Sequence, residues 1–159
     1  MERKYIADTS FFLNFNLIYN IFKIYTVPEV IEEVKDRLNR IKLGMFDINV
    51  LNPKKKTIEE IKKKILEFMP LEKLSDTDIK IIALAYELKG IVLTDDFSIQ
   101  NACYFLRIPF QGVTREIKEA YIFRKLCPNC RKIYSNDKKK CSICGSNLKI
   151  IIYRKISRE

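Results

Sequence analysis

Two short apolar runs in this sequence end in aspartate. Residues 90–96 read Gly-Ile-Val-Leu-Thr-Asp-Asp, and an N-terminal run, Tyr-Ile-Ala, is followed by Asp8. Successive branched apolar residues are typical of a strand buried on both faces of a parallel sheet, and ligands bind such sheets at the carboxyl ends of the strands. Carboxylates there can hold a hard divalent cation. The structural alternative is that Asp8, Asp95 and Asp96 only begin turns and cap helices.

A third candidate ligand, Glu33, lies on a helix predicted over residues 29–41. The apolar residues of this helix form one stripe, which Glu33 borders. Glu29 and Glu32 are close rivals for the same role. The structural alternative for Glu33 is a surface ion pair with Arg37, one helical turn further on.

Asp78 lies in the first turn of a helix that is predicted to begin after Ser75 and to end at Gly90. An acid at this position favours the free N–H groups and the helix dipole, so capping alone explains Asp78. A role as a ligand requires the fold to bring it close to the acids at the strand ends.

Four cysteines near the C-terminus form two Cys-x-x-Cys pairs that are separated by ten residues. They are Cys127, Cys130, Cys141 and Cys144. Two pairs at this spacing supply the four thiolates that one structural zinc ion requires; disulfides or a redox pair are the alternative. Four thiolates leave no open position for catalysis. Gly145, after the second pair, suits a turn with positive φ, and the remaining Cys103 is expected to be a buried thiol.

Histidine is absent from the chain. This absence excludes a Ser-His-Asp triad, a histidine-based nuclease and a zinc enzyme with histidine ligands. Any hydrolytic activity must therefore depend on carboxylates and metal ions.

Positive charge is concentrated at the C-terminal end. Residues 1–114 carry 17 Lys+Arg and 16 Asp+Glu, whereas residues 115–159 carry 13 and 4. This imbalance favours a polyanionic partner, nucleic acid ahead of a membrane surface, although lysine is abundant throughout the chain. The basic side chains expected to contact RNA phosphates are Arg131, Lys132, Lys138, Lys139 and Lys140.

Strand and helix patterns alternate along the first 114 residues, with short connections. This order predicts an α/β fold with a mainly parallel sheet flanked by helices. Helix starts are predicted at Thr57, which forms a capping-box sequence with Glu60, and at Ser98. A strand over residues 108–113 is expected at the sheet edge because its proline cannot donate a ladder hydrogen bond.

We divide the chain into an α/β domain at residues 1–114, a basic linker or helix at residues 115–125, and a small zinc ribbon at residues 126–159. The N-terminus lacks the apolar core of a signal peptide, and no run approaches the roughly 20 apolar residues that cross a bilayer. We therefore expect a soluble, cytoplasmic protein with no membrane partner.

Four short motifs, taken in order, resemble those of PIN-domain nucleases. They are Ile-Ala-Asp-Thr-Ser, Val-Pro-Glu-Val-Ile-Glu-Glu-Val, Leu-Ser-Asp-Thr-Asp and Val-Leu-Thr-Asp-Asp. The resemblance covers approximately residues 1–114 and implies a PIN-like domain whose acids bind Mg²⁺ or Mn²⁺ and cut single-stranded RNA. By position in the motifs, these acids are Asp8, Glu33, Asp78 and Asp96, with Asp95 as an accessory acid.

The pairing of a PIN-like domain with a four-cysteine ribbon resembles the Nin-one-binding endonuclease family, in a compact archaeal form. This resemblance implies maturation of the 3′ end of small-subunit ribosomal RNA on a pre-ribosomal particle. Three other functions fit the same residues: a non-catalytic RNA-binding factor for ribosome assembly, a PIN-type toxin ribonuclease, and a flap-type DNA nuclease.

Overall fold

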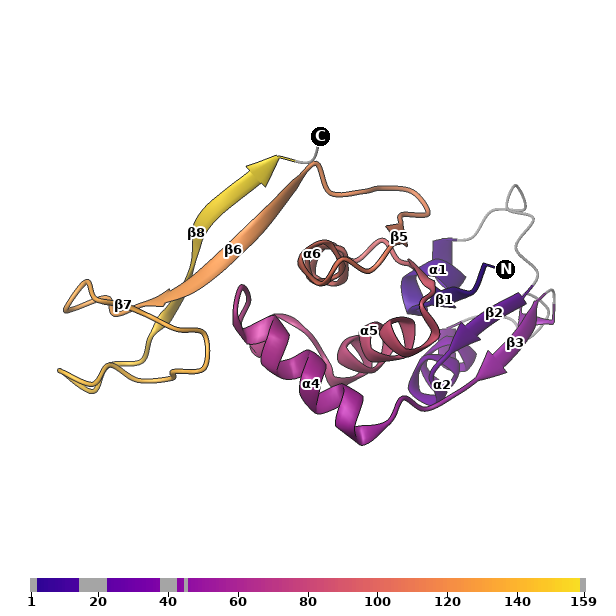
Figure 1. Ribbon diagram of the computed structural model, residues 1–159, viewed down its shortest axis with the longest axis horizontal. Helices are drawn as coiled ribbons and strands as arrows, with labels where there is room; N and C mark the ends of the chain where they lie inside the picture. Colours follow the sequence, from indigo (N-terminus) through magenta and orange to yellow (C-terminus); the bar gives the residue numbers. More distant parts are fainter. Residues whose placement is uncertain (1–2, 15–22, 38–42, 45, 158–159) are drawn as a thin grey trace.

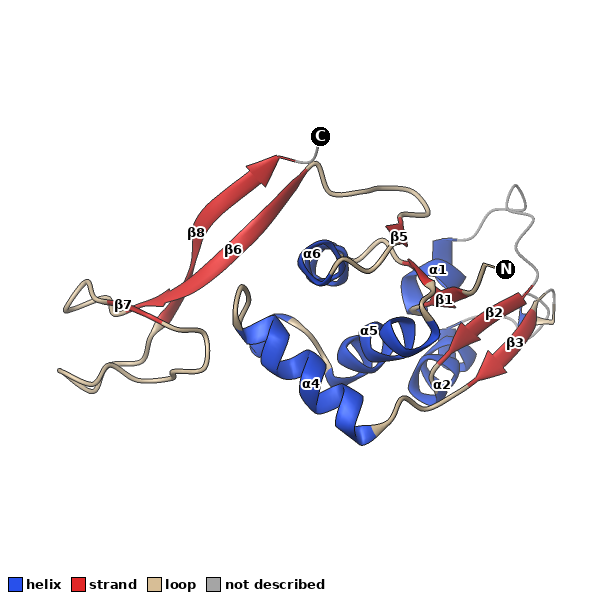
Figure 2. Ribbon diagram, in the orientation of Figure 1, coloured by secondary structure: helices blue, strands red, loops and turns tan. Residues whose placement is uncertain are grey.

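The computed structural model describes residues 3–14, 23–37, 43–44 and 46–157. Strands and helices alternate up to residue 111, except that three helices follow one another between β3 and β4, and strands alone come after residue 111 (Figure 1, Figure 2). The elements are β1 (Tyr5–Ala7), α1 (Thr9–Asn14), β2 (Lys23–Thr26), α2 (Pro28–Arg37), β3 (Asp47–Val50), α4 (Lys55–Leu66), the 3₁₀ helix η1 (Leu71–Lys73), α5 (Asp76–Leu88), β4 (Ile91–Leu93), α6 (Phe97–Leu106), β5 (Phe110–Gln111), β6 (Glu119–Leu126), β7 (Ile133–Tyr134) and β8 (Lys149–Ser157). None of the helices in these ranges is both long enough and apolar enough to span a lipid bilayer.

Five strands form one parallel sheet in the order β3-β2-β1-β4-β5. β1 is central, because Ile6 pairs with Tyr25 of β2 on one side and with Val92 of β4 on the other. The carboxyl ends of all five strands therefore lie at the same edge of the sheet. The α/β class and the edge position of β5 are confirmed.

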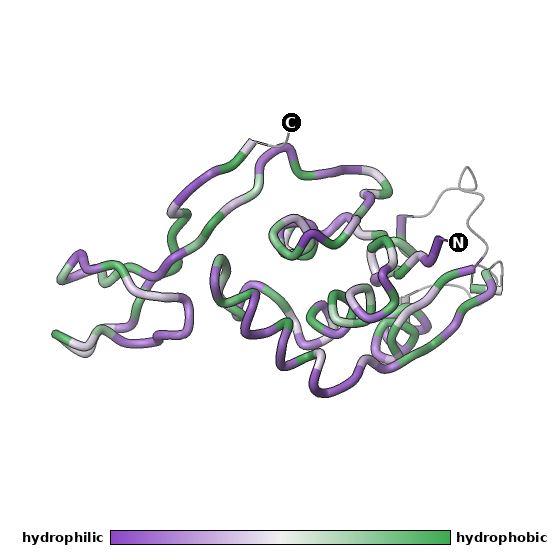
Figure 3. The backbone as a smooth tube through the Cα atoms, in the orientation of Figure 1, coloured by the Kyte–Doolittle hydropathy of each residue, from purple (hydrophilic) through white to green (hydrophobic). Residues whose placement is uncertain are grey.

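The hydrophobic core fills the space between the sheet and its helices. α1 packs against α2, whereas α4, α5 and α6 pack against one another. Figure 3 shows hydrophilic and hydrophobic positions alternating along α4, whose Ile61 and Ile65 are buried. Cys103 of α6 belongs to the core, as predicted. The predicted helix at residues 29–41 is observed as α2, and residues 38–41 lie outside the described ranges.

The predicted cap of α5 is confirmed. The Ser75 hydroxyl accepts the N–H of Asp78 at 3.1 Å, and the Asp78 carboxylate accepts the N–H of Ser75 at 2.7 Å. This capping box fixes the Asp78 side chain at the start of the helix.

The sequence predicts that α5 ends at Gly90, but Lys89 ends the helix and Gly90 has a different role. Lys89 takes the left-handed conformation that ends the helix, with φ of 51°. A Cβ added at Gly90 would lie 2.1 Å from Ile6 Cδ1 and 2.8 Å from the Lys4 carbonyl oxygen. The glycine therefore allows the entry to β4 to pack closely against β1.

The predicted start of α4 is wrong. The helix begins at Lys55 instead of Thr57, and its capping residue Lys54 has no side-chain cap. The N–H of Lys54 instead donates to the carboxylate of Glu87 on α5, at 2.8 Å. A contact between helices that are distant in sequence replaces the local capping box.

A second, antiparallel sheet has the strand order β7-β6-β8. The prediction of a linker or helix at residues 115–125 is wrong, because β6 begins at Glu119 and pairs with β8 along its whole length. β8 lies more than twenty residues further along the chain, so local sequence patterns do not predict that residues 119–126 form a strand. The boundaries at residues 114 and 126 stay predictions.

Specific contacts join the second sheet to the α/β unit. The Asn101 side chain on α6 accepts the N–H of Tyr121 at 2.7 Å and donates to its carbonyl at 3.0 Å. The buried ammonium of Lys125 lies 2.6 Å from a carboxylate oxygen of Glu72. β6 is therefore anchored to the α/β unit at both of these residues.

Candidate metal centre and four-cysteine site

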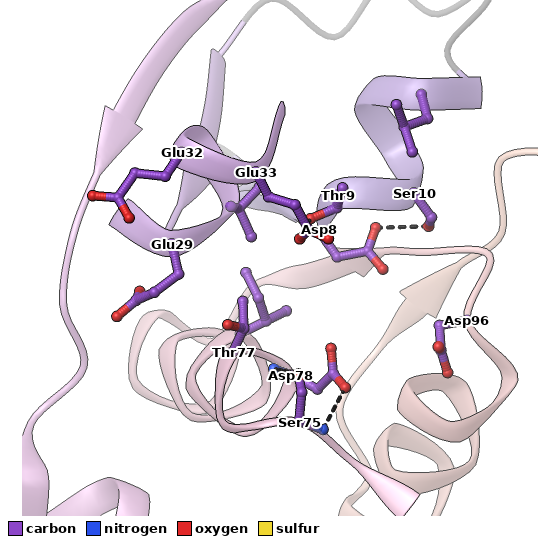
Figure 4. A pocket seen from close by; sticks show the side chains of 13 residues that line it. Asp8, Thr9, Ser10, Glu29, Glu32, Glu33, Ser75, Thr77, Asp78 and Asp96 are labelled. Atoms are coloured by element: carbon purple, nitrogen blue, oxygen red, sulfur yellow. Dashed lines mark hydrogen bonds between the residues drawn. The ribbon is translucent and has the colours of Figure 1, made fainter. Parts of the chain in front are cut away.

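One cavity of about 600 Å³ contains all four of the principal acids predicted from the sequence. They are Asp8, Glu33, Asp78 and Asp96. Figure 4 shows them around the cavity on four separate parts of the chain: the end of β1, α2, the start of α5 and the loop after β4. The parallel sheet brings Asp8 and Asp96 to the same edge, because β1 and β4 are neighbouring strands whose carboxyl ends lie side by side.

Asp8 both caps a helix and lines the cavity. Its Oδ1 accepts the Ser10 hydroxyl at 2.7 Å and the N–H of Phe11 at 3.0 Å, and its Oδ2 accepts the hydroxyl of Thr94. The Phe11 bond caps the first turn of α1. The two predicted roles of Asp8, as a helix cap and as a ligand of a cation, are therefore compatible.

The environment of Asp8 disfavours its charged form. Burial raises its pKa from 3.8 to about 6, even though hydrogen bonds from Thr94, Ser10 and Phe11 lower it, and the negative charge of Asp96 raises it further. A bound cation would favour the ionised carboxylate at this position. Carboxylate oxygens are also the ligands that Mg²⁺ prefers, so the donor set fits a hard divalent cation.

Three glutamates of α2 line the cavity, and only one extends toward the aspartates. Glu33 accepts the hydroxyl of Thr9 at 2.6 Å. Glu29 forms an ion pair with Lys80 of α5. Figure 4 shows the carboxylates of Glu29 and Glu32 pointing away from the other acids. This arrangement favours Glu33 over its two rivals.

Asp78 interacts electrostatically with two of the other acids. Burial raises its pKa, the hydrogen bonds from Ser75 lower it, and the negative charges of Asp96 and Glu33 raise it again, so that the net change is an increase. Like charges that face one cavity destabilise one another unless a cation neutralises them.

Asp96 is the cap of α6, where Ser98 was predicted to be. Its Oδ1 accepts the N–H groups of Ser98 at 2.6 Å and Ile99 at 3.1 Å. The helix consequently begins one residue earlier, at Phe97.

Asp95 lies outside the cavity and is 2% exposed. Its carboxylate accepts hydrogen bonds from the side chain of Asn14 and from the backbone of Val113 and Thr114, at 2.7–2.9 Å. Burial alone would raise its pKa, but these hydrogen bonds lower it overall. Asp95 fastens the segment after β5, and its role as an accessory acid stays a prediction.

Three hydroxyl groups that the sequence analysis did not single out hold these acids in place. They are Thr9, Ser10 and Thr94. Thr94 also accepts the N–H of Asp96 at 3.0 Å, and thereby connects the ends of β1 and β4. Their position in the sequence could have identified these three residues, since each stands within two residues of an acid at a strand end.

The four C-terminal cysteines form a compact thiol cluster. Their sulfur atoms lie within 4.8 Å of one another, and no other Cys, His, Asp or Glu group is this compact in the part of the chain that the structure describes. None of the four is in a disulfide. The N–H of Cys130 donates to Cys127 Sγ at 3.3 Å, and the N–H of Ile143 donates to Cys141 Sγ at 3.4 Å. The cluster therefore fits one structural zinc ion, held by all four thiolates.

The two cysteine turns share one backbone design. The residue after each pair has positive φ, 58° at Arg131 and 73° at Gly145, and its N–H donates at 3.0 Å to the carbonyl of the first cysteine. The prediction for Gly145 is confirmed. The equivalent role of Arg131 was missed because arginine carries no signal for positive φ.

The five basic side chains predicted to contact RNA are all exposed and lie on and between the cysteine turns. They are Arg131, Lys132, Lys138, Lys139 and Lys140. Lys132 lies over the ring of Tyr134, with 5.5 Å from its Nζ to the ring centroid. Exposed cations beside an aromatic ring suit contacts with a single-stranded nucleic acid.

Comparison with known proteins points to one family. Residues 5–88 match the model of the PIN domain of ribonuclease. The chain is 32% identical to Endoribonuclease Nob1 of Pyrococcus abyssi, over 99% of both chains, and 33% identical to Endoribonuclease Nob1 of Methanocaldococcus jannaschii, over 94% of this chain and 77% of the relative. It is also 30% identical to Ribonuclease VapC1 of Thermoplasma acidophilum, over 91% of this chain and 76% of the relative. The chain therefore belongs to the PIN-domain ribonucleases and, within them, to the Nob1 endoribonuclease family.

Proposed function

We propose that this protein is a metal-dependent endoribonuclease that cuts single-stranded RNA at the acidic cavity. The observation that carries this proposal is the arrival of four acids from four parts of the chain at one cavity. In this proposal Asp8 and Asp96 are the principal ligands of Mg²⁺ or Mn²⁺, and Asp78 and Glu33 hold the ion directly or through water. The ion would activate a water molecule for attack on phosphorus and stabilise the charge that develops on the phosphate.

The residues around the acids have defined tasks. The hydroxyls of Ser10 and Thr94 fix both oxygens of Asp8, and Thr9 fixes Glu33, so the ligand oxygens are held before substrate binds. Such preorganisation reduces the reorganisation that the reaction itself requires. The buried setting of Asp8 also strengthens its attraction for a cation, because the local dielectric is low.

The substrate in this proposal is the precursor of small-subunit ribosomal RNA, whose 3′ end the protein matures on a pre-ribosomal particle in the cytoplasm. Support comes from the Nob1 relatives that match nearly the whole chain, four-cysteine module included. In this account the zinc module grips RNA phosphates through its exposed lysines and arginine and takes no part in bond cleavage.

Replacement of Asp8 tests the proposal. With Mn²⁺, the wild-type protein should cut a short RNA that spans the small-subunit 3′ junction, and Asp8→Asn should lower the rate by 10²-fold or more, on the order of one lost electrostatic catalytic group. The measurement is the cleavage rate on a labelled oligonucleotide, with folding checked by circular dichroism.

The matched control is Asp76→Asn, because Asp76 lies in the first turn of α5 but does not line the cavity. Its rate should equal that of the wild type. Activity that persists in Asp8→Asn, or in excess EDTA, would contradict the proposal, and equal cleavage of a matched DNA strand would favour a flap-type nuclease.

A PIN-type toxin ribonuclease is a second candidate, favoured by the similarity to Ribonuclease VapC1 over most of the chain. The same assay separates the two. A toxin should cut RNAs unrelated to the ribosomal junction at least as fast, whereas the proposed processing enzyme should prefer the junction.

A further inference from the structure

Phe97 is an exposed aromatic residue directly beside one of the four acids. It is 48% exposed, and it is the first residue of α6, immediately after the cap Asp96. Consecutive Cα atoms lie about 3.8 Å apart. The backbone of Phe97 is therefore adjacent to that of Asp96, which lines the acidic cavity.

Phe97 also lines a second cavity, of about 450 Å³, which shares no lining residue with the acidic one. The other walls come from the segment that leads into β6: Glu116, Ile117, Lys118, Glu119 and Tyr121. We call this second cavity the aromatic cleft. It is lined by two aromatic residues, Phe97 from α6 and Tyr121 from β6, and Phe97 follows directly in the chain after Asp96, which lines the acidic cavity.

Two buried amides of α6 fix the shape of the aromatic cleft. Gln100 accepts the N–H of Ile117 at 2.7 Å and donates to the carbonyl of Arg115 at 2.9 Å. Asn101 makes two hydrogen bonds with the backbone of Tyr121. Gln100 and Asn101 are 0% and 3% exposed. The cleft is therefore held by buried hydrogen bonds on both sides and does not depend on a ligand for its shape.

Cations accompany both rings of the cleft. The guanidinium carbon of Arg115 lies 4.9 Å from the centroid of the Phe97 ring, and the Lys155 ammonium lies 5.7 Å from that of Tyr121. Glu119 pairs with Lys155 at 3.6 Å and accepts the Tyr121 hydroxyl at 2.9 Å, so the charge of Lys155 is offset and Arg115 supplies the positive charge of the cleft, beside Phe97. Aromatic faces flanked by positive groups match a nucleotide, which has a flat base and a negative phosphate.

We propose that the aromatic cleft is a nucleobase subsite, in which a base of single-stranded RNA next to the scissile phosphate stacks on Phe97. The proposal rests on the proposed function, because it takes the acidic cavity as the place of cleavage. Arg115 then neutralises a phosphate beside the stacked base. Unpaired bases can enter such a cleft and paired bases cannot, so the subsite would also select for single-stranded RNA.

The test combines base removal with residue removal. A short RNA across the small-subunit junction is prepared with one abasic nucleotide at each position in turn. Its Kd is measured by fluorescence anisotropy with the zinc-loaded protein and no added Mg²⁺ or Mn²⁺, so that the cysteine module stays intact and metal-dependent cleavage does not occur. For the wild type, one or two adjacent positions should lose about 5- to 150-fold in affinity, the range for one stacked base. In Phe97→Ala this loss should disappear at those positions, and Phe97→Tyr should restore it.

Tyr86 supplies a matched control. It is also an exposed aromatic residue, 40% exposed, with a Lys64 ammonium over its ring and a cavity of about 450 Å³ beside it. However, it lies near the C-terminal end of α5, where the chain enters β4, and so at the opposite edge of the sheet from the acids. Tyr86→Ala should leave the abasic profile of the wild type unchanged.

The possible outcomes separate this inference from the proposed function. If Phe97→Ala retains the same position-specific loss as the wild type, or if Phe97→Tyr does not restore that loss in a folded protein, the subsite is overturned. If the profile depends on Phe97 but the wild type never cleaves RNA with Mn²⁺, the subsite stands and the proposed activity fails.

Discussion

At the scale of single residues, the environment of Asp8 disfavours its ionised form. It is buried, it faces the charge of Asp96, and its pKa is raised to about 6 in spite of three hydrogen bonds. In the unfolded chain the same group ionises near 3.8. The folded state therefore binds the proton of the Asp8 carboxyl more tightly than the unfolded chain does. The contribution of this group to the free energy of unfolding is fully present below pH 4 and is lost as the pH rises through 6.

This shift predicts that Asp8→Asn stabilises the protein in EDTA at neutral pH. At pH 3.5 the two proteins should differ little, whereas at pH 7 the variant should gain roughly 2–3 kcal/mol, because one pKa unit corresponds to about 1.36 kcal/mol. The measurement is the free energy of unfolding in urea at several pH values. A difference that does not change between pH 4 and 7 would show that Asp8 ionises normally.

The sequence located Asp8, Asp78 and Asp96 because each stands at a strand end or in a first helical turn, where local pattern is informative. The motif position distinguished Asp96 as a principal acid from Asp95 as an accessory one, but the hydrogen bonds of Asp95 to the segment after β5 join residues too distant in sequence to be predicted. The sequence also left Glu33 open against Glu29 and Glu32, and the contacts of Glu33 with Thr9 and of Glu29 with Lys80 distinguish them.

At the scale of elements, predictability follows the range of the interactions. The cap of α5 involves Ser75 and Asp78, three residues apart, and was predicted. The start of α4 depends on Glu87, and β6 depends on β8; both partners are distant in sequence, and both predictions were wrong. Local capping and periodicity are readable from one sequence, whereas a strand that needs a distant partner is not.

Gly90 provides a test at this scale. Gly90→Ala should lower the free energy of unfolding by about 1–3 kcal/mol, since the new Cβ would press against the Lys4 carbonyl and Ile6. The neighbouring Lys89→Gly is the control and should not lose stability, because Lys89 already occupies the left-handed conformation that glycine tolerates. Equal stability of Gly90→Ala and the wild type in urea would mean that the approach to β1 is looser than described.

At the scale of the whole molecule, charge and chemistry are divided between two parts. The acidic cavity lies in the α/β unit, and Lys132, Lys138, Lys139 and Lys140 are exposed on the cysteine module. Figure 1 shows β6, β7 and β8 on the opposite side of the molecule from β1, β2 and β3. The buried contact of Lys125 with Glu72 joins the two parts. In the proposed function, the basic module holds one RNA strand while the backbone of that strand is presented to the acids.

Replacing Lys138, Lys139 and Lys140 by glutamine in one triple variant should weaken RNA binding and flatten its dependence on salt. Each lost phosphate contact lowers the slope of log K against log salt by about 0.7 for a single strand, so three contacts lower it by about 2. The matched control is glutamine at Lys62, Lys63 and Lys64 of α4, where Lys62 and Lys64 already pair with glutamates of the same helix. An unchanged slope in the first variant would show that Lys138, Lys139 and Lys140 do not contact RNA phosphates.

The most direct test of a shared cation site is calorimetric titration of Mn²⁺ into the zinc-loaded protein. The wild type and Asp76→Asn should bind Mn²⁺ with the same affinity, whereas Asp8→Asn and Asp78→Asn should each bind it at least tenfold more weakly. Wild-type affinity in both cavity variants would contradict the claim that these acids hold one divalent ion together.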